Sequence, residues 1–478
     1  MKKFLKIDTF IYIILFGVCV FILLQSPLAP FAKSIITTDS GIYIYAAQKI
    51  LDGLLMYKDV IDIKGPFLYF IDAVALFIFN RHFIGIWIFE VLSLFAASII
   101  MYKTARFFAG KISSLLAVVT GMLFFVICLA RGNMTEEWSL PYISAALYIF
   151  VDYLKNNKPL SIVRLFILSL TFVLTFMLRA NLVAMWAGFG IVLLIKWIVE
   201  KKYKELIRSL SIILLFVLLC VSPFFLYFYC KGTLPDAIYW VFKFNMFEYA
   251  SGSNLLMSIQ KTILQISYIG IIIPVLIAVY MFFRDKTTVH GGVLLALFFT
   301  VTACALGHSF WHYYANFIPL LVIPYSYLFA KIEEISKRKY LFLFILFAAL
   351  NSLFIGRQIW LIYNNYWEKN KYALKVEMLT DIIIQNTKPF DKILVKGYRS
   401  EVYLYSGRAS ATRFSHVQHQ SSLAKENYIK DAEKAMPKLI IQDNPQDFGE
   451  SFNLDSLLHN RYKLINTIDN TEIWKLKE

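Results

Sequence analysis

Long apolar segments separated by short polar ones make up roughly the first 360 residues of the chain. About eleven of these segments reach the roughly 17–25 residues that a helix needs to cross a bilayer, and charged or turn-forming residues bound each one. The pattern therefore predicts a polytopic α-helical membrane protein with about eleven transmembrane helices. The predicted spans cover residues 8–28, 83–102, 113–130, 138–154, 160–178, 182–198, 209–229, 263–283, 289–306, 313–330 and 340–357.

One further apolar segment, PFLYFIDAVALFIFN at residues 66–80, is short and contains Asp72. If it crossed the membrane, the basic clusters KNNK, KKYKELIR and KRK would all face outward. If it lies in the outer interface or dips in and returns, all of them face the cytoplasm, as the positive-inside rule expects. We therefore predict that it does not cross. The extracytoplasmic side then holds residues 30–81, 131–137, 179–181, 230–262, 307–312 and everything after about residue 356.

The polar stretch after the first span contains GIYIYAAQKILDG, residues 41–53, with apolar residues at helical spacing. This pattern predicts a helix that lies on the membrane surface and ends at Gly53. Asp39 or Ser40 would cap its N-terminus. The first extracytoplasmic loop is thus predicted to consist of interfacial helices.

From residue 357 the chain is more polar and has five short strand-like runs with helical segments between them. Such alternation predicts a small extracytoplasmic α/β domain. We therefore expect a transmembrane domain at residues 1–356 and this second domain at 357–478. The runs are KILVK (392–396), EVYLYSG (401–407), KLIIQD (438–443), YKLINTI (462–468) and EIWKL (472–476).

Composition agrees with a membrane protein, since 59% of the 478 residues are hydrophobic and 17% are charged. The net charge of +16 lies in short clusters between apolar spans, which argues against a nucleic-acid-binding protein. Five cysteines occur and none forms a CxxC motif, so neither a disulfide framework nor a thiolate metal site is expected. The apolar run behind the initial MKK is interpreted as an uncleaved first helix.

Acidic and basic residues crowd the first extracytoplasmic loop. Asp39 follows the first span closely, and an ionisable group at this depth is costly unless it is used or paired; helix capping is the alternative. In YKDVIDIKGP, residues 57–66, Gly65 and Pro66 form a sharp turn behind Lys64. Lys64 would meet a lipid phosphate at headgroup level, or the loop is simply solvated. Its neighbours Tyr57, Asp59 and Asp62 are candidate substrate-binding residues.

Two further extracytoplasmic segments contain candidate residues. RGNMTEEW contributes the cation Arg131 and the acids Glu136 and Glu137, although Thr135 with these acids also makes a good helix start. Arg179 is another cation on this side. In GHSFWHYY, His308 and His312 stand at i, i+4 and Tyr313 follows. Two histidines at this spacing can bind zinc, but no third ligand is apparent, so a lipid or sugar pocket is favoured and no metal site is predicted.

These segments together resemble a known family. The features in question are one span, an early acid, the pattern A..IL.G...Y.D..D.KGP..Y over residues 47–69, a second acidic loop and a later HYY segment. Together they resemble the GT-C superfamily of glycosyltransferases that use lipid-linked sugars. The best match is its branch of dolichyl-phosphate-mannose protein mannosyltransferases and aminoarabinose transferases. There, the first-loop aspartate corresponds to Asp39 and the lysine of a K-P-P turn corresponds to Lys64. Gly65 replaces the first proline, and Ser40 replaces a second acid common in the family.

The resemblance implies an integral membrane glycosyltransferase that moves a sugar from a polyprenyl-phosphate donor to an acceptor hydroxyl, with inversion. Asp39 would act as the base, and Lys64, with Arg131 or Arg179, would hold the donor phosphate; Glu136 or Glu137 corresponds to the second-loop acid. No obligatory cofactor is implied, and a divalent metal is neither required nor excluded. The expected partners are the donor, an envelope glycan, lipid or protein acceptor, and membrane lipids. A polysaccharide polymerase or ligase that uses lipid-linked sugars, or a transporter, is the alternative.

Overall fold

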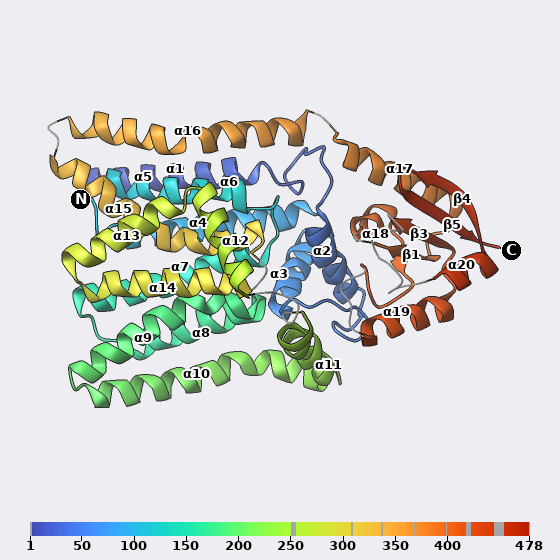
Figure 1. The fold of residues 1–478 in the computed structure, drawn as a ribbon, viewed down its shortest axis with the longest axis horizontal. Helices are drawn as coiled ribbons and strands as arrows, with labels where there is room; N and C mark the ends of the chain where they lie inside the picture. Colours follow the sequence, from blue (N-terminus) through green and yellow to red (C-terminus); the bar gives the residue numbers. More distant parts are fainter. Residues whose placement is uncertain are drawn as a thin grey trace. The chain divides into compact units, whose positions relative to one another are not determined.

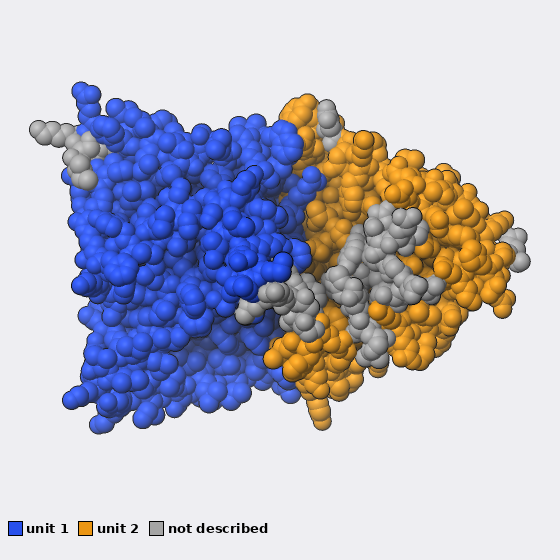
Figure 2. Space-filling model, in the orientation of Figure 1, with its two compact units in different colours: residues 1–25, 87–226, 253–362 blue, residues 26–86, 227–252, 363–478 orange. Residues whose placement is uncertain are grey.

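The structure is a computed structural model that describes residues 2–249, 255–306, 309–335, 338–367, 369–397, 399–416, 422–443 and 454–477. Helices form most of the chain, and a small sheet lies in its last hundred residues. The chain divides into two compact units, drawn in separate colours in Figure 2. Unit 1 comprises residues 1–25, 87–226 and 253–362, and unit 2 comprises residues 26–86, 227–252 and 363–478.

Unit 1 is a bundle of long apolar helices that share one continuous hydrophobic core (Figure 1). Apolar residues occupy most positions of these helices, as expected for segments that face both other helices and lipid. The helices are α1 (Lys2–Leu23), α4 (Ile84–Ala105), α5 (Lys111–Leu123), α6 (Phe125–Cys128), α7 (Thr135–Asn156), α8 (Ile162–Leu178), η1 (Ala180–Val183), α9 (Ala184–Val199), α10 (Tyr203–Cys230), α12 (Leu255–Tyr268), α13 (Ile272–Asp285), α14 (Thr288–Leu306), η4 (Trp311–Phe317), α15 (Ile318–Ile335) and α16 (Lys339–Tyr366).

Each predicted span coincides with one of these helices or with a consecutive pair, so the polytopic helical fold is confirmed. Among the described residues, seven helices are long and apolar enough to cross a membrane, and a bent pair adds an eighth candidate. Three shorter apolar helices cover Asp8–Leu23, Pro66–Ile78 and Ile162–Leu178. The figure of about eleven crossings stays a prediction.

The span predicted at residues 263–283 is not a single straight helix, which corrects the sequence interpretation. Its two halves, Leu256–Tyr268 and Ile272–Asp285, meet at an angle of 96°. Gly270 ends the first half at φ +81°, a conformation that favours glycine. Pro274 lies in the first turn of α13, where its missing N–H costs little. Glycine followed by proline therefore stops one helix and starts the next in a new direction.

Helices α9 and α14 approach each other closely because small residues line their contact. A Cβ atom added to Gly188 of α9 would lie 2.4 Å from the backbone nitrogen of Ala296 in α14. On the other side of the contact, a Cβ on Gly292 would lie 2.6 Å from the ring of Phe189. Small residues at helix interfaces let backbones pack together in membranes, where dispersion contacts drive association.

Unit 2 contains a five-stranded sheet in the order β2-β1-β3-β5-β4. Strand β1 (Lys392–Lys396) pairs in parallel with β2 (Ala409–Ser410) and β3 (Leu439–Asp443), whereas β5 (Thr471–Leu476) pairs antiparallel with β3 and with β4 (Tyr462–Ile468). Helices α17 (Lys371–Asn386), α18 (Glu401–Ser406), α19 (Ser422–Ala435) and α20 (Asp455–Arg461) accompany the sheet. The predicted small α/β domain is thus confirmed, and four of its five predicted strands are strands.

The fifth predicted strand, EVYLYSG at residues 401–407, is wrong, because residues 401–406 form the helix α18. Valine and tyrosine favour strands, but tertiary packing overrides this preference. Gly407 at φ +65° ends the helix in the left-handed conformation, as a helix C-terminus commonly requires. The buried Tyr403 hydroxyl accepts a hydrogen bond from the backbone N–H of Val395 at 2.8 Å, which ties α18 to β1.

The first loop belongs to unit 2 and packs inside it. Helix α2 (Thr38–Leu51) buries eight consecutive residues, from Ser40 to Ala47, so it is covered on all sides over this stretch. Ile35 and Tyr45 join the hydrophobic core of the sheet domain. Helix α3 (Pro66–Ile78) has 13 residues and a length of about 20 Å, shorter than the roughly 30 Å hydrocarbon core of a bilayer. The interfacial placement of these helices and the boundary at residues 356–357 stay predictions.

Candidate functional site

The predicted site residues fall into both units. Unit 2 holds Asp39, Tyr57, Asp59, Asp62 and Lys64. His308 lies outside the described residues. Unit 1 holds the remaining candidates, namely Arg131, Glu136, Glu137, Arg179, His312 and Tyr313.

Asp39 is the second residue of α2 and is partly exposed. The N-cap of this helix is Thr37, with extended backbone at φ −70° and ψ 159°. Capping by Asp39 or Ser40 is therefore wrong, because the N-cap lies two or three residues earlier in the chain, at Thr37. A carboxylate in the first helical turn is favourable beside the positive end of the helix dipole. In the described part of the chain, the Asp39 side chain makes no hydrogen bond or ion pair, so it remains available to a ligand.

The loop that carries Lys64 is held by its own polar groups. Tyr57 adopts φ +70°, and its buried hydroxyl donates a hydrogen bond to the backbone carbonyl of Lys64 at 2.7 Å. Burial, with a contribution from the Asp62 carboxylate, raises the pKa of Tyr57 well above its usual value, so the phenol stays a neutral donor. Asp59 closes the other end of the loop by accepting the backbone N–H of Leu55 at 2.9 Å.

Asp62 is buried and serves the loop structure. Its Oδ2 accepts the hydroxyl of Tyr69 in α3 at 2.6 Å, and its Oδ1 accepts the backbone N–H of Ile63 at 2.7 Å. Asn245 of the segment η2 (Tyr239–Tyr249) donates to the backbone carbonyl of Ile63 at 2.9 Å. Both sides of Lys64 are thereby fixed in place.

Lys64 itself stands immediately before the N-terminus of α3. Gly65 is the N-cap at φ −66° and ψ 152°, and Pro66 is the first residue of the helix. The chain thus changes direction at Gly65 and Pro66, as the sequence predicts. The lysine is half-buried. An anion beside it would meet both the ammonium group and the positive end of the helix dipole.

In unit 1, Glu136 and Arg179 form a buried ion pair. Arg179 Nη1 lies 3.0 Å from Glu136 Oε1, and the side-chain exposures are 14% and 1%. Thr135 donates its hydroxyl to Glu136 Oε2 at 2.9 Å. Arg179 also donates to the hydroxyl of Tyr313, and its guanidinium lies 4.1 Å from the centre of that ring. The three predicted residues therefore form one cluster, in which a carboxylate already balances the arginine.

Glu137 contributes to a different contact in unit 1. The backbone N–H of Asn133 donates to Glu137 Oε2 at 3.1 Å and also to Glu90 of α4. Four consecutive residues before α7, Ala130 to Asn133, have positive φ. Such backbone is strained outside glycine and commonly stands at functional sites. Arg131 is part of this turn and is half-buried. Glu90 was not among the predicted site residues. An ionisable residue inside an apolar span commonly indicates a functional site, so this signal could have pointed to it.

His312 lies in η4 and stacks on Phe310 with ring centres 5.8 Å apart. Ser309 and Phe310 are not helical, and η4 is a 3-10 helix that begins at Trp311. The predicted placement of His308 and His312 on one helix face stays a prediction, because His308 lies outside the described residues. Among the described residues, no three His, Cys, Asp or Glu side chains are grouped as a metal site would need.

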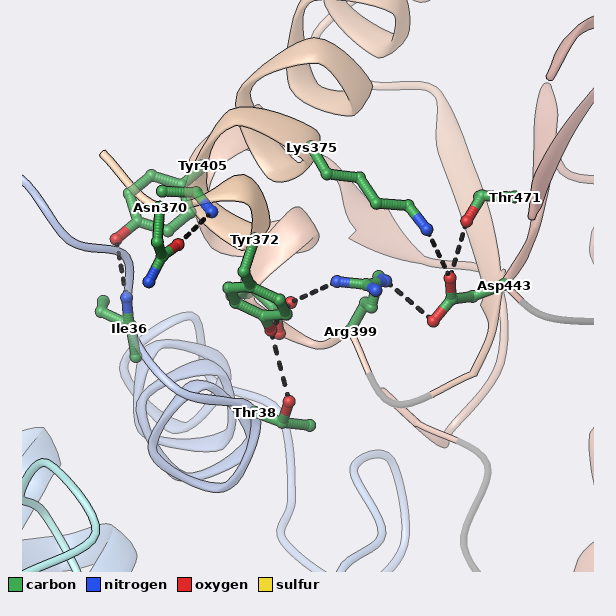
Figure 3. Close-up of polar contacts among 11 residues, drawn as sticks. Ile36, Thr38, Asn370, Tyr372, Lys375, Arg399, Tyr405, Asp443 and Thr471 are labelled. Atoms are coloured by element: carbon green, nitrogen blue, oxygen red, sulfur yellow. Dashed lines mark hydrogen bonds and ion pairs between the residues drawn. The ribbon is translucent and has the colours of Figure 1, made fainter. Parts of the chain in front are cut away.

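A polar cluster of unit 2 at the start of α2 escaped the sequence interpretation, and Figure 3 shows most of it. Arg399 Nε lies 2.8 Å from Asp443 Oδ2, and Thr471 donates to Asp443 Oδ1 at 2.6 Å. Tyr372 donates to Glu401 and lies 3.4 Å from the hydroxyl of Thr38, the residue next to Asp39. We call Thr38, Tyr372, Arg399, Glu401 and Asp443 the Arg399 cluster.

The Arg399 cluster fixes the beginning of α2. The backbone N–H of Ile36 donates to Tyr405 Oη at 3.3 Å, which holds the chain just before the helix (Figure 3). A Cβ atom on Gly41 would lie 3.1 Å from the backbone nitrogen of Glu401, so α2 and α18 touch there. Burial raises the pKa of Glu401 to about 7 despite its contacts with Tyr372 and Arg399. The pKa of Asp443 is lowered, because the hydrogen bond from Thr471 and the charge of Arg399 outweigh its burial.

No protein-family model matches the sequence, and no curated protein matches it. Solved structures do match. ArnT from Cupriavidus metallidurans, bound to undecaprenyl phosphate, superposes with a TM-score of 0.67 over 97% of both chains at 11% identity. The oligosaccharyltransferase of Archaeoglobus fulgidus, in complex with zinc and sulfate, superposes with a TM-score of 0.59 over 91% of this chain and 68% of its own at 13% identity.

Both similar proteins belong to the GT-C superfamily. Identities of 11% and 13% are too low to indicate a shared reaction, but the coverage includes nearly the whole chain and therefore the first loop and the C-terminal sheet. The resemblance to the GT-C superfamily that the sequence predicts thus holds for the fold over nearly the whole chain. This chain therefore has the fold that these two GT-C proteins share.

Proposed function

We propose that this protein is a membrane glycosyltransferase that moves a sugar from a polyprenyl-phosphate donor to an acceptor hydroxyl at the extracytoplasmic face. The observation that carries the proposal is the state of Asp39, a partly exposed carboxylate that has no partner among the described residues. The eight residues that follow it in α2 are all buried. An acid held in this way is suited to accept a proton. The similarity to ArnT, which was solved with undecaprenyl phosphate, supports the choice of donor.

The proposed reaction is a single displacement with inversion. The acceptor oxygen attacks C1 of the sugar, its proton passes to the Asp39 carboxylate, and the new oxygen–carbon bond forms as the bond from C1 to the phosphate oxygen breaks. The leaving polyprenyl phosphate keeps the electron pair and gains negative charge. Lys64, before the N-terminus of α3, supplies a fixed positive charge for it. Arg131 is a further candidate for this role, whereas Arg179 is less suited because Glu136 balances its charge.

Asp39→Asn tests the proposal. The amide keeps the size of the side chain but cannot accept the proton, so transfer from a polyprenyl-phosphate sugar should fall roughly 10²- to 10⁴-fold. Asp236→Asn is the matched control, because Asp236 also stands partly exposed in the first turn of a helix of unit 2, α11 (Leu234–Ile238). The control should keep full activity. Unchanged transfer by Asp39→Asn at equal membrane abundance would rule out Asp39 as the base.

Lys64→Ala tests the proposed role of Lys64 in binding the donor phosphate separately from the proposed role of Asp39 as the base. Removing the ammonium group takes away a counter-charge of the phosphate, so the KM for the donor should rise. Lys58→Ala, a change of a nearby exposed lysine in the same loop, should leave that KM unchanged. Equal donor KM values for both variants would contradict the role of Lys64.

A further inference from the structure

A polar pocket of unit 2 lies beside the loop that carries Lys64. Its volume is about 450 Å³, within the range of small-ligand sites in proteins. The C-terminal half of α2 and the loop after it form one side, and β1, β2, the turn behind β2 and α19 form the other. Alanines at 409, 411 and 435 line part of the pocket and leave room beside the polar side chains.

Positive charge dominates the lining. The basic residues are Lys49, Lys392, Arg413 and Lys434, against two carboxylates, Asp59 and Asp431. Arg413 Nε pairs with Asp431 Oδ2 at 2.9 Å, and Lys49 pairs with Asp52 at 2.9 Å. Lys392 and Lys434 are exposed and form no ion pair with the described part of the chain. The pocket therefore offers two ammonium groups that form no ion pair with any described carboxylate, and Asp59 is the one lining carboxylate outside the Arg413–Asp431 pair among the described residues.

The pocket is joined to the proposed active loop. The backbone N–H of Ile61 donates to the carbonyl of Arg413 at 2.9 Å, and Ile61 pairs with Phe414 as an isolated β-bridge. The backbone N–H of Ser410 donates to Tyr45 Oη of α2 at 2.9 Å. A ligand in this pocket would thus contact the first loop and the sheet domain at once.

We infer that this pocket binds a negatively charged group of the acceptor, such as a phosphate or carboxylate carried on a glycan, at a distance from the hydroxyl that receives the sugar. The inference rests on the proposed function. Asp39 and Lys49 are ten residues apart on one helix, which corresponds to about 15 Å. An acceptor that reaches both places must therefore be an extended glycan or glycolipid of several sugar units.

Binding of defined tetrasaccharides by the full-length protein in detergent tests the inference without any transfer reaction. The probes are tetragalacturonate, which carries a carboxylate on every unit, the neutral maltotetraose, and inorganic phosphate. We expect tetragalacturonate to bind more tightly than maltotetraose, with an affinity that decreases as salt increases. Phosphate should bind weakly and should compete with tetragalacturonate, because it provides the charge without the sugar contacts.

Lys392→Gln combined with Lys434→Gln should weaken tetragalacturonate binding about tenfold and leave maltotetraose unaffected. Lys388→Gln combined with Lys463→Gln is the matched control, since both are exposed lysines of the same unit outside the pocket. Equal losses in both double variants, equal binding of the neutral probe, or no tetragalacturonate binding by the unchanged protein would overturn the inference. Because binding is measured directly, these outcomes are independent of the Asp39 transfer test.

Discussion

At the residue scale, the raised pKa of Glu401 predicts that the stability of unit 2 depends on pH. Burial raises the pKa of Glu401 to about 7 from an ordinary value of 4.5, so the folded protein binds this proton more tightly than the unfolded chain. Its contribution to stability is then complete below about pH 4.5 and decreases as the pH rises through 7, by roughly 3 kcal/mol at most. We expect hydrogen-exchange protection of β1, corrected for intrinsic rates, to decrease between pH 5 and pH 8.

The variant Glu401→Gln isolates this effect, because the amide imitates the protonated acid. In Glu401→Gln, most of the decrease in hydrogen-exchange protection between pH 5 and pH 8 should disappear. Glu433→Gln on α19 is the control, since Glu433 is exposed and should leave the pH dependence as in the unchanged protein. A decrease that persists in Glu401→Gln would mean that a group other than Glu401 is responsible.

A second residue-scale prediction concerns the ion pair of unit 1. Glu136→Gln leaves the guanidinium of Arg179 buried without its charge partner, which typically costs about 3–5 kcal/mol. Arg179→Met alone removes the arginine from the buried Glu136 carboxylate and should lower stability in the same way. The double variant should recover part of this loss, because it removes both charges together. Thermal unfolding in detergent measures all three, and strictly additive losses would show that the two side chains do not interact.

At this scale, the sequence predicts the local structure of a residue when its structural neighbours are also close to it in the chain. Lys64 was placed correctly before a helix because Gly65 and Pro66 follow it directly. The Arg399 cluster could not be found in this way, since it joins Thr38 to residues more than 330 positions away. The same limit applies to Arg179, whose pairing with Glu136 depends on tertiary packing.

At the scale of elements, the contact between α9 and α14 allows a sharp test. Gly188→Ala places a methyl group where the backbone of Ala296 leaves no room, so we expect a loss of roughly 1–3 kcal/mol in stability. Gly190→Ala in the same helix has nothing within 4 Å of the added Cβ and should be neutral or slightly stabilising. Unfolding temperatures in detergent compare the two, and equal effects would contradict the close packing.

The apolar pattern located the helices well because bilayer length sets a strong requirement. It failed where one residue decides the direction of the chain. Gly270 turns a predicted single span into a bent pair, and a glycine within an apolar run gives little warning of this. It also failed at residues 401–406, where strand-forming residues adopt a helix that the neighbouring β1 supports.

At the scale of the whole molecule, the positive-inside argument makes one prediction about sidedness. If segment 66–80 does not cross the membrane, the first loop and the sheet domain face the extracytoplasmic side and the loop at residues 155–158 faces the cytoplasm. Asn80, Asn470 and Asn156 are exposed sites that report on these three places. Single cysteines at Asn80 and Asn470 should react with a membrane-impermeant maleimide in intact cells, and one at Asn156 should react only after lysis.

The native cysteines need control in this experiment, because Cys230 is exposed and Cys220 is half-buried. Both are replaced by serine in the parent protein, which should then give no signal in intact cells. Asn80 and Asn470 belong to the same compact unit, so they should always label from the same side. Labelling of both only after lysis would invert the topology, and it would move Asp39 and Lys64 to the cytoplasmic face. A polyprenyl-phosphate sugar presented outside the cell could then not reach the proposed base, so this result would also contradict the proposed reaction.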